Sequence, residues 1–154
     1  MPPASLSGFI WFYTKPFWPW IAVTSVLAAL VAVIEVSLFA FLGSVVDWLA
    51  KTTPETVFVD YSWQLLLLAG LVLLLHPLLN FIYELIVHQT LMGNYPMRIR
   101  WEAHRYVLRQ SLEFFQNDFA GRIATKVMQA ALAVRETVLK TADVFVFVSV
   151  YFTA

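Results

Sequence analysis

Ionisable side chains inside long apolar stretches are the residues of this chain that could do chemistry. Glu35 lies near the middle of a mostly apolar run of 30 residues, from 17 to 46. An ionised carboxylate at that depth of a membrane costs about 2.5 to 3.5 kcal/mol on insertion scales, so Glu35 should face the interior of a helix bundle. Two roles stay open for it: a site that binds a cationic substrate or couples protons, and a structural residue hydrogen-bonded to neighbouring helices.

A second acid, Glu84, lies four residues before His88, which places both side chains on one face of a helix. Glutamate and histidine at this spacing would also suit two ligands of a metal ion. The sequence offers no third ligand, because His76 lies more than two helical turns away. We therefore interpret the pair as an interfacial hydrogen bond and expect no metal site. Glu35 and Glu84 are the candidates for a substrate pathway.

ATP hydrolysis is not a chemistry that this sequence can perform alone. A phosphate-binding loop needs the pattern G-x-x-x-x-G-K-[ST], and none of the five glycines precedes a lysine at that spacing. The motifs H-E-x-x-H and G-x-S-x-G do not occur, and no cysteine is available as a nucleophile. We expect the chain not to be an enzyme and to hold no cofactor of its own.

The composition indicates a membrane protein. The chain has 154 residues, of which 60% are hydrophobic and only 13% are charged, well beyond the apolar share of a soluble domain. The long apolar runs have the length of helices rather than of strands. We predict an all-α membrane protein whose long transmembrane helices extend into the cytoplasm.

Polar breaks and aromatic clusters divide the chain into predicted elements. A proline in the second apolar run, Pro77, should kink that helix. The predicted elements are an interfacial elbow helix (8–16), a first span (17–46), an external loop (47–62), a second span (63–91) with a cytoplasmic extension to 110, a short contact helix (112–119), a cytoplasmic helix (122–143) and the start of a third span (144–154).

The distribution of charge predicts the orientation in the membrane. Residues 92–143 contain eight of the ten Lys and Arg residues, and cytoplasmic loops carry that excess. We therefore expect 92–143 and the N-terminus to be cytoplasmic and Lys51 to lie outside. Acids are interleaved with these bases, which does not favour nucleic-acid binding. The last apolar run has only 11 residues, so we expect a fragment that stops partway through its third helix.

The cytoplasmic region has a helical pattern and not that of a loose loop. After the aromatic stretch 111–122, apolar residues recur at steps of three or four and form one packing stripe: Ile123, Val127, Ala131, Val134 and Val138. Before that stretch, Tyr95 and Ile99 belong to a similar stripe, and Pro96 should bend or interrupt the helix. Two helical stalks joined by a tight turn are predicted.

The turn contains Phe114-Phe115, the polar residues 116–118, and then Gly121-Arg122-Ile123. This order resembles the first intracellular loop in the membrane domain of ABC exporters, where a Phe-Phe pair, a polar stretch, a glycine and an aliphatic residue follow one another. The resemblance implies the type 1 exporter fold, here truncated, with six spanning helices in each of two membrane domains. It also implies two ATPase domains, which bind ATP and Mg²⁺ and drive alternating access.

On this resemblance, 112–119 would be the first coupling helix, which contacts an ATPase domain. The residues implied in that contact are Leu112, Phe114, Phe115, Asn117, Phe119 and Gly121. The resemblance further implies a bacterial inner-membrane protein that pairs with a second membrane domain, identical or different, and exports a hydrophobic or amphiphilic cargo. Two alternatives stay open: a stand-alone membrane scaffold that holds a soluble partner through 111–122, and a membrane-embedded enzyme that uses Glu84 and His88.

Overall fold

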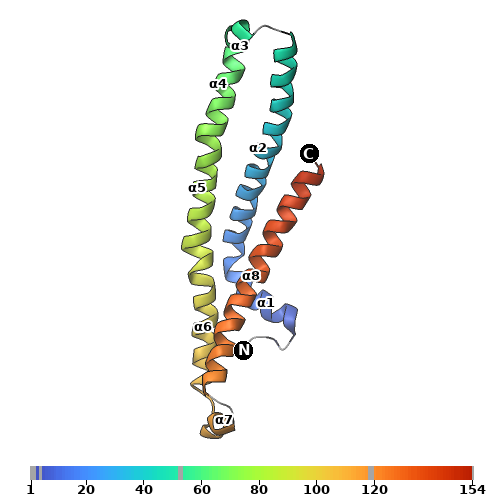
Figure 1. Ribbon diagram of the computed structural model, residues 1–154. Helices are drawn as coiled ribbons and strands as arrows, with labels where there is room; N and C mark the ends of the chain where they lie inside the picture. The colour runs from blue at the N-terminus through green and yellow to red at the C-terminus, as the bar shows by residue number, and fades with distance from the viewer. Residues whose placement is uncertain (1–2, 4, 52–53, 118–119, 154) are drawn as a thin grey trace. The chain divides into compact units, whose positions relative to one another are not determined.

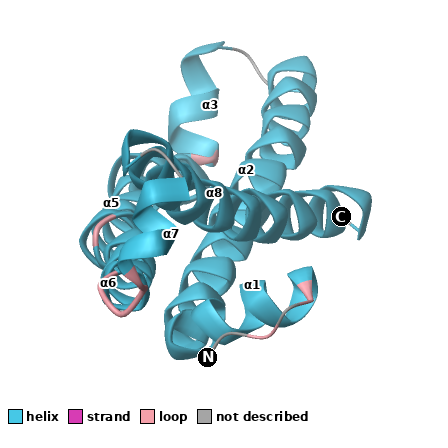
Figure 2. Ribbon diagram, turned by 90° about the horizontal axis from the view of Figure 1, so that it is seen from below, coloured by secondary structure: helices cyan, strands magenta, loops and turns pink. Residues whose placement is uncertain are grey.

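The structure, a computed structural model, describes residues 3, 5–51, 54–117 and 120–153. This part of the chain is helical apart from short turns and contains no strand (Figures 1 and 2), so the predicted all-α class is confirmed. In chain order the elements are α1 (Leu6–Thr14), η1 (Lys15–Phe17), α2 (Trp18–Lys51), α3 (Pro54–Asp60), α4 (Ser62–Gly70), η2 (Leu71–Leu75), α5 (His76–Ile86), η3 (Val87–Met92), α6 (Asn94–Val107), α7 (Leu112–Asn117) and α8 (Ala120–Thr153).

Two continuous helical stretches, Leu6–Lys51 and Ser62–Val107, are long and apolar enough to cross a membrane. At a rise of about 1.5 Å per residue, each is about twice as long as the hydrocarbon core of a bilayer is thick. Both therefore have room for a span and for an extension beyond it. The region predicted as an external loop differs from expectation, because α2 continues to Lys51 and Pro54–Asp60 forms α3. Pro54 suits the first position of a helix, because an N–H group at that position has no hydrogen-bond acceptor within the helix.

The second stretch changes its helical pitch twice, and a proline follows each change within a few residues. The π-helical η2 ends just before His76-Pro77. A proline cannot donate to the carbonyl four residues earlier, and a wider turn relieves its clash with that carbonyl. The second π-helical segment, η3, is followed by a turn at Gly93, and Pro96 then lies in the first turn of α6, where proline is tolerated. The chain accommodates both prolines while remaining helical.

The chain divides into two compact units, which are described separately. The first, here called the stalk unit, comprises Met1–Thr24 and Leu85–Asp143. The second, the span unit, comprises Ser25–Glu84 and Val144–Ala154. The long helices α2 and α8 each contribute residues to both units.

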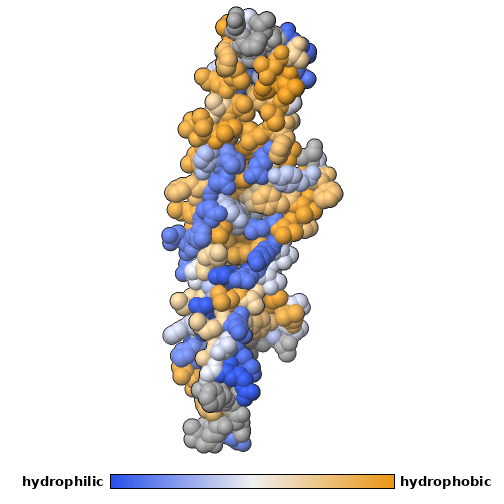
Figure 3. All heavy atoms as spheres, viewed as in Figure 1, coloured by the Kyte–Doolittle hydropathy of each residue, from blue (hydrophilic) through white to orange (hydrophobic). Residues whose placement is uncertain are grey.

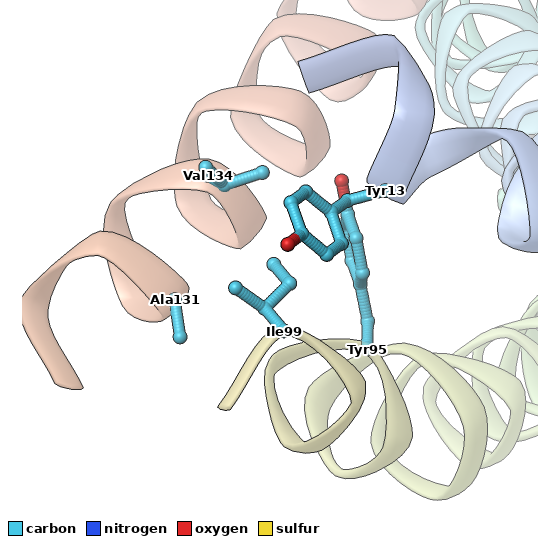
Figure 4. Packing of buried hydrophobic residues seen from close by; sticks show 5 residues of the cluster. All are labelled: Tyr13, Tyr95, Ile99, Ala131 and Val134. Atoms are coloured by element: carbon cyan, nitrogen blue, oxygen red, sulfur yellow. The ribbon is translucent and has the colours of Figure 1, made fainter. Parts of the chain in front are cut away.

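The core of the stalk unit forms where α1, α6 and α8 meet. Its buried members are Tyr13 from α1, Tyr95 and Ile99 from α6, and Ala131 and Val134 from α8 (Figure 4). Phe17 packs its ring against that of Tyr95, with 4.8 Å between the ring centres. Tyr13 of the predicted elbow thus buries its ring against the stalk helices, whereas Trp11 and Phe12 stay exposed.

The two predicted apolar stripes supply most of this core. On α8, Ile123, Ala131 and Val134 are buried, as the stripe predicts. On α6, Tyr95 and Ile99 are at most 2% exposed and sit one helical turn apart. Because both stripes face the same core, α6 and the first part of α8 lie side by side, with α7 joining them (Figure 1).

The span unit keeps most of its large apolar side chains on the surface. Phe39, Leu73 and Leu74 are each at least 70% exposed, and Figure 3 shows mainly apolar residues over α4 and the second half of α2. Such a surface suits lipid rather than water. At the end of the unit, the Trp48 ring stacks on Tyr61 at 4.4 Å and holds the end of α2 against the start of α4.

Candidate functional site

The aromatic stretch between the stalks folds as a short helix held by local hydrogen bonds. After α6, Arg109 N–H donates to the Tyr106 carbonyl (3.2 Å) and Gln110 N–H to the Val107 carbonyl (3.0 Å), so the helix closes with tight turns. Ser111 then caps α7: Phe114 N–H lies 3.4 Å from Ser111 Oγ and 3.1 Å from Ser111 O. Serine is a preferred residue at this position because its hydroxyl accepts from a free N–H of the first turn.

The paired phenylalanines of α7 have different surroundings. Their rings meet edge to face, 5.4 Å apart at 86°. Phe115 lines a groove of about 560 Å³ between α6, α7 and α8, whereas Phe114 is not among the residues that line it. Both rings remain a little over a third exposed. Phe115 therefore lies on the side of α7 that faces the groove, whereas Phe114 does not line it.

The groove is mainly apolar with a polar margin. Arg100 and His104 supply its polar groups, and Arg100 Nε is buried without a hydrogen-bond partner among the described residues. The full lining is Met97, Arg100, Trp101, His104, Val107, Phe115, Ile123, Ala124, Val127 and Met128. Residues from α6, α7 and α8 thus line one groove.

The structure describes only part of the predicted contact set. Leu112 and Asn117 are the first and last residues of α7, but their side chains lie outside the described part, as does Phe119. Gly121 lies inside α8, which begins at Ala120, two residues before the start predicted for the cytoplasmic helix.

Glu35 lies on the packed face of α2. It follows Ala28 and Ala32 at helical spacing, and those two residues are at most 3% exposed. Its carboxylate has two neighbours in the span unit: the Tyr151 hydroxyl donates to Oε2 at 2.7 Å, and His76 Nε2 lies 3.7 Å from Oε1. The intramembrane acid thus faces other helices, as predicted, and contacts both α5 and α8.

Asn80 holds its amide against His76 on the same helix. Asn80 Nδ2 donates to the His76 carbonyl at 3.0 Å. The same nitrogen lies 3.2 Å from His76 Nε2, the ring nitrogen that also faces Glu35 Oε1.

An apolar pocket of about 500 Å³ opens beside this carboxylate, within the span unit. Glu35 and the Tyr151 hydroxyl are its polar groups, and Phe39 and Phe41 supply aromatic surface. The complete lining is Glu35, Leu38, Phe39, Phe41, Leu42, Val45, Leu68, Val72 and Tyr151. A cavity of this size with a few convergent polar groups has the features of a small-molecule site.

The other predicted acid lies elsewhere. Glu84, near the end of α5, and His88, in η3, are both exposed, and Glu84 lines neither cavity. Among the described residues, no group of three or more His, Cys, Asp or Glu side chains is placed to hold a metal ion.

Sequence reasoning missed the partners of Glu35. Tyr151 is 116 residues away and lies in an apolar run that looked uniform, and His76 was considered only as a possible ligand beside Glu84. One signal was available, because a buried intramembrane acid needs polar partners on other helices. His76 and Tyr151 are polar residues of the other two apolar runs.

Long apolar helices, a surface suited to lipid and a short helix between two stalks are the features of a helical membrane domain. The chain matches the ABC transporter transmembrane region over residues 21–153. It is also 45% identical, over 151 residues, to a protein of Haemophilus influenzae named "Uncharacterized ABC transporter ATP-binding protein". The chain belongs to the ABC transporter transmembrane family and forms a membrane part of an ABC transporter.

That alignment covers 98% of the chain but only 24% of the relative, so the chain spans about a quarter of the length of the protein that it matches. No solved structure matches the chain.

Proposed function

We propose that this chain is the N-terminal part of the membrane domain of an ATP-driven exporter and that α7 is its first coupling helix. Motion of an ATPase domain would enter through α7 and move α6 and α8. The single observation that carries this proposal is the placement of the Phe pair, with Phe115 against both stalks and Phe114 outside their groove. Because the groove that Phe115 lines is shared by both stalks, a displacement of α7 would act where α6 and α8 meet.

The partners and the orientation of the chain follow from this assignment. ATP and Mg²⁺ would be held by ATPase domains, and a second membrane domain, identical or different, would complete the pathway. Residues 92–143 and the N-terminus would lie in the cytoplasm of a bacterial cell, with the helices crossing its inner membrane several times. Glu35, beside its pocket, is the described acid best placed to meet cargo, and Glu84 is a second candidate for the pathway.

The test compares Phe114→Ala with Phe115→Ala in the complete transporter that carries this segment. Removing an exposed aromatic anchor typically costs at least about 2 kcal/mol of binding energy at an interface. Phe114→Ala should therefore uncouple cargo-stimulated ATP hydrolysis while expression and the thermal unfolding midpoint stay near wild type. Phe115→Ala removes packing from the groove, so it should lower the unfolding midpoint as well as coupling.

Glu113→Ala is the matched control, because Glu113 is an exposed neighbour on α7 outside the groove. It should change neither property strongly. Normal coupling in Phe114→Ala, or loss of folded protein before loss of coupling, would overturn the assignment of α7. Retention of a soluble partner other than an ATPase domain by the wild-type chain, lost in Phe114→Ala, would favour the scaffold alternative.

A further inference from the structure

We propose that the groove between α6, α7 and α8 binds an amphiphilic organic monoanion, a compact apolar body that carries one carboxylate. Arg100 would hold the carboxylate, and the rings of Trp101 and Phe115 would cover the apolar body. The groove belongs to the stalk unit and shares no lining residue with the pocket beside Glu35. This inference goes beyond the proposed function and does not depend on it, because it concerns ligand binding and needs no role for α7 in coupling.

The charge of the groove favours an anion. No Asp or Glu is among the described residues that line it. Arg100 forms no ion pair with a described residue, and its buried Nε has no hydrogen-bond partner among them. Arg98, two residues earlier on α6, differs, because its Nε lies 3.3 Å from Glu102 Oε1. A buried donor without a partner is costly, and a ligand carboxylate would accept bidentate hydrogen bonds from the Arg100 guanidinium.

The walls of the groove favour a ligand with an apolar body. Apart from Arg100 and His104, every lining side chain is aliphatic, aromatic or methionine. Met97 and Trp101 are each 60% exposed, and together with the other walls they form one contiguous apolar patch. Lipid does not account for this exposure, because α6 also carries charged residues on the same turns. A ligand seated against Trp101 would take this apolar surface out of water.

The size and the charge of the groove select a small monoanion. Its volume of about 560 Å³ is in the range of small-molecule sites. A polyanion such as nucleic acid would need several cations along its path, and the lining offers one guanidinium and one imidazole. His104 lies four residues after Arg100 and so on the same face of α6, where an imidazole N–H is a second donor. One carboxylate on an apolar body matches these groups.

The experiment measures equilibrium binding of radiolabelled 2-naphthoate to the complete transporter in phosphatidylcholine nanodiscs without ATP, with empty nanodiscs as background. The flat rings of this probe suit the aromatic walls, and its carboxylate is ionised at neutral pH. 2-Naphthamide has nearly the same shape and no charge, so it is the matched ligand control. The wild type should bind the carboxylate saturably and at least about tenfold more tightly than the amide, because only the carboxylate forms charge-assisted hydrogen bonds with the guanidinium.

Four variants locate the site. Arg100→Gln should weaken naphthoate binding at least about tenfold, because the charge-assisted hydrogen bonds are lost. Arg98→Gln is the matched control, since it removes a cation of the same helix from outside the groove lining, and it should bind naphthoate like the wild type. Trp101→Ala should weaken both ligands, because it removes an apolar contact that they share. Phe114→Ala should bind both normally, because Phe114 does not line the groove. This site and the coupling helix can therefore fail independently.

Three results would overturn the proposal. The first is the absence of saturable naphthoate binding to the wild type, which would mean that other parts of the transporter fill the groove. The second is equal wild-type affinity for naphthoate and naphthamide. The third is naphthoate binding that is no weaker in Arg100→Gln than in Arg98→Gln. The comparison of the two ligands in the wild type needs no variant, so it decides the charge of the ligand even if Arg100→Gln does not fold, and Trp101→Ala still locates the site.

Discussion

The hydroxyl groups of Thr14 and Tyr95 share a hydrogen bond of 2.6 Å although 81 residues separate them in the chain. Both side chains are buried, at 5% and 0% exposure. The bond joins the elbow helix α1 to the stalk helix α6 at the centre of the stalk core. Thr14 also donates to the Ile10 carbonyl at 2.7 Å, so only one of the two residues has a second partner.

This asymmetry gives the first prediction. Thr14→Val leaves the Tyr95 hydroxyl buried without a partner and should cost about 1 to 3 kcal/mol, whereas Tyr95→Phe should cost only about 1 kcal/mol. The double variant removes both groups and should cost less than the sum of the single changes. Unfolding midpoints of the complete transporter in detergent would rank the three variants. Strict additivity would mean that the two hydroxyls are not coupled.

A second prediction concerns the space between α8 and the stalk core. Ala131 is fully buried, whereas its neighbour Ala130 is exposed. Ala131→Leu should force the stalk helices apart and cost about 1 to 3 kcal/mol, while Ala130→Leu should change stability by no more than about 0.5 kcal/mol. Because both variants replace Ala by Leu, a difference between their thermal unfolding midpoints measures the effect of packing alone. Similar midpoints would contradict the placement of α8 in the core.

The orientation of the chain gives a third prediction. Because the cationic excess lies in 92–143, a cysteine at Glu113 should be protected from impermeant thiol reagents in sealed cells, and a cysteine at Lys51 should react. Both positions are exposed in the structure, so burial does not explain a difference. This chain has no cysteine of its own, and the rest of the transporter would be made cysteine-free. External labelling at Glu113 would reverse the orientation.

A fourth prediction concerns the cap of α7. Ser111→Ala removes the hydroxyl that faces Phe114 N–H and should destabilise the first turn by about 0.5 to 2 kcal/mol. Because α7 has only six residues, coupling of ATP hydrolysis to cargo should fall. Ser111→Asp keeps an acceptor at the cap and is the matched control, so it should couple normally. Equal coupling in both variants would show that the cap does not hold α7 in its working conformation.

Sequence patterns predicted the fold far better than they predicted the polar contacts. The apolar runs and their helical period predicted the long helices, and the stripe containing Ala131 and Val134 predicted which face of α8 is buried. Such patterns are local, because the spacing of apolar residues within one helix predicts only which face of that helix is buried. The loop expected at 47–62 is partly helical, since the polar residues there are compatible with short helices as well as with turns.

The site at Glu35 required three helices to be placed together. Its position in a span predicted that the side chain would face other helices, and it does. The identity of its partners depends on how α2, α5 and α8 are rotated about their axes. That rotation is set by packing and by the wide turn of η2 before Pro77, which no periodicity in the sequence reveals. For the same reason the pattern did not distinguish Phe114 from Phe115.

The π-helical turn at Leu71–Leu75 makes this helix tolerant of a change that the first helix cannot accept. A π turn holds one residue more than an α turn, so deleting a single leucine there would restore the α-helical pitch, with a kink at Pro77. Residues on either side would keep the faces that they already present. A deletion in the α-helical turns between Ala32 and Glu35 would instead rotate everything beyond it by about 100° and swing the carboxylate away from Tyr151. Length variation during the evolution of this transporter should therefore collect at Leu71–Leu75 and be absent from the helix that carries Glu35.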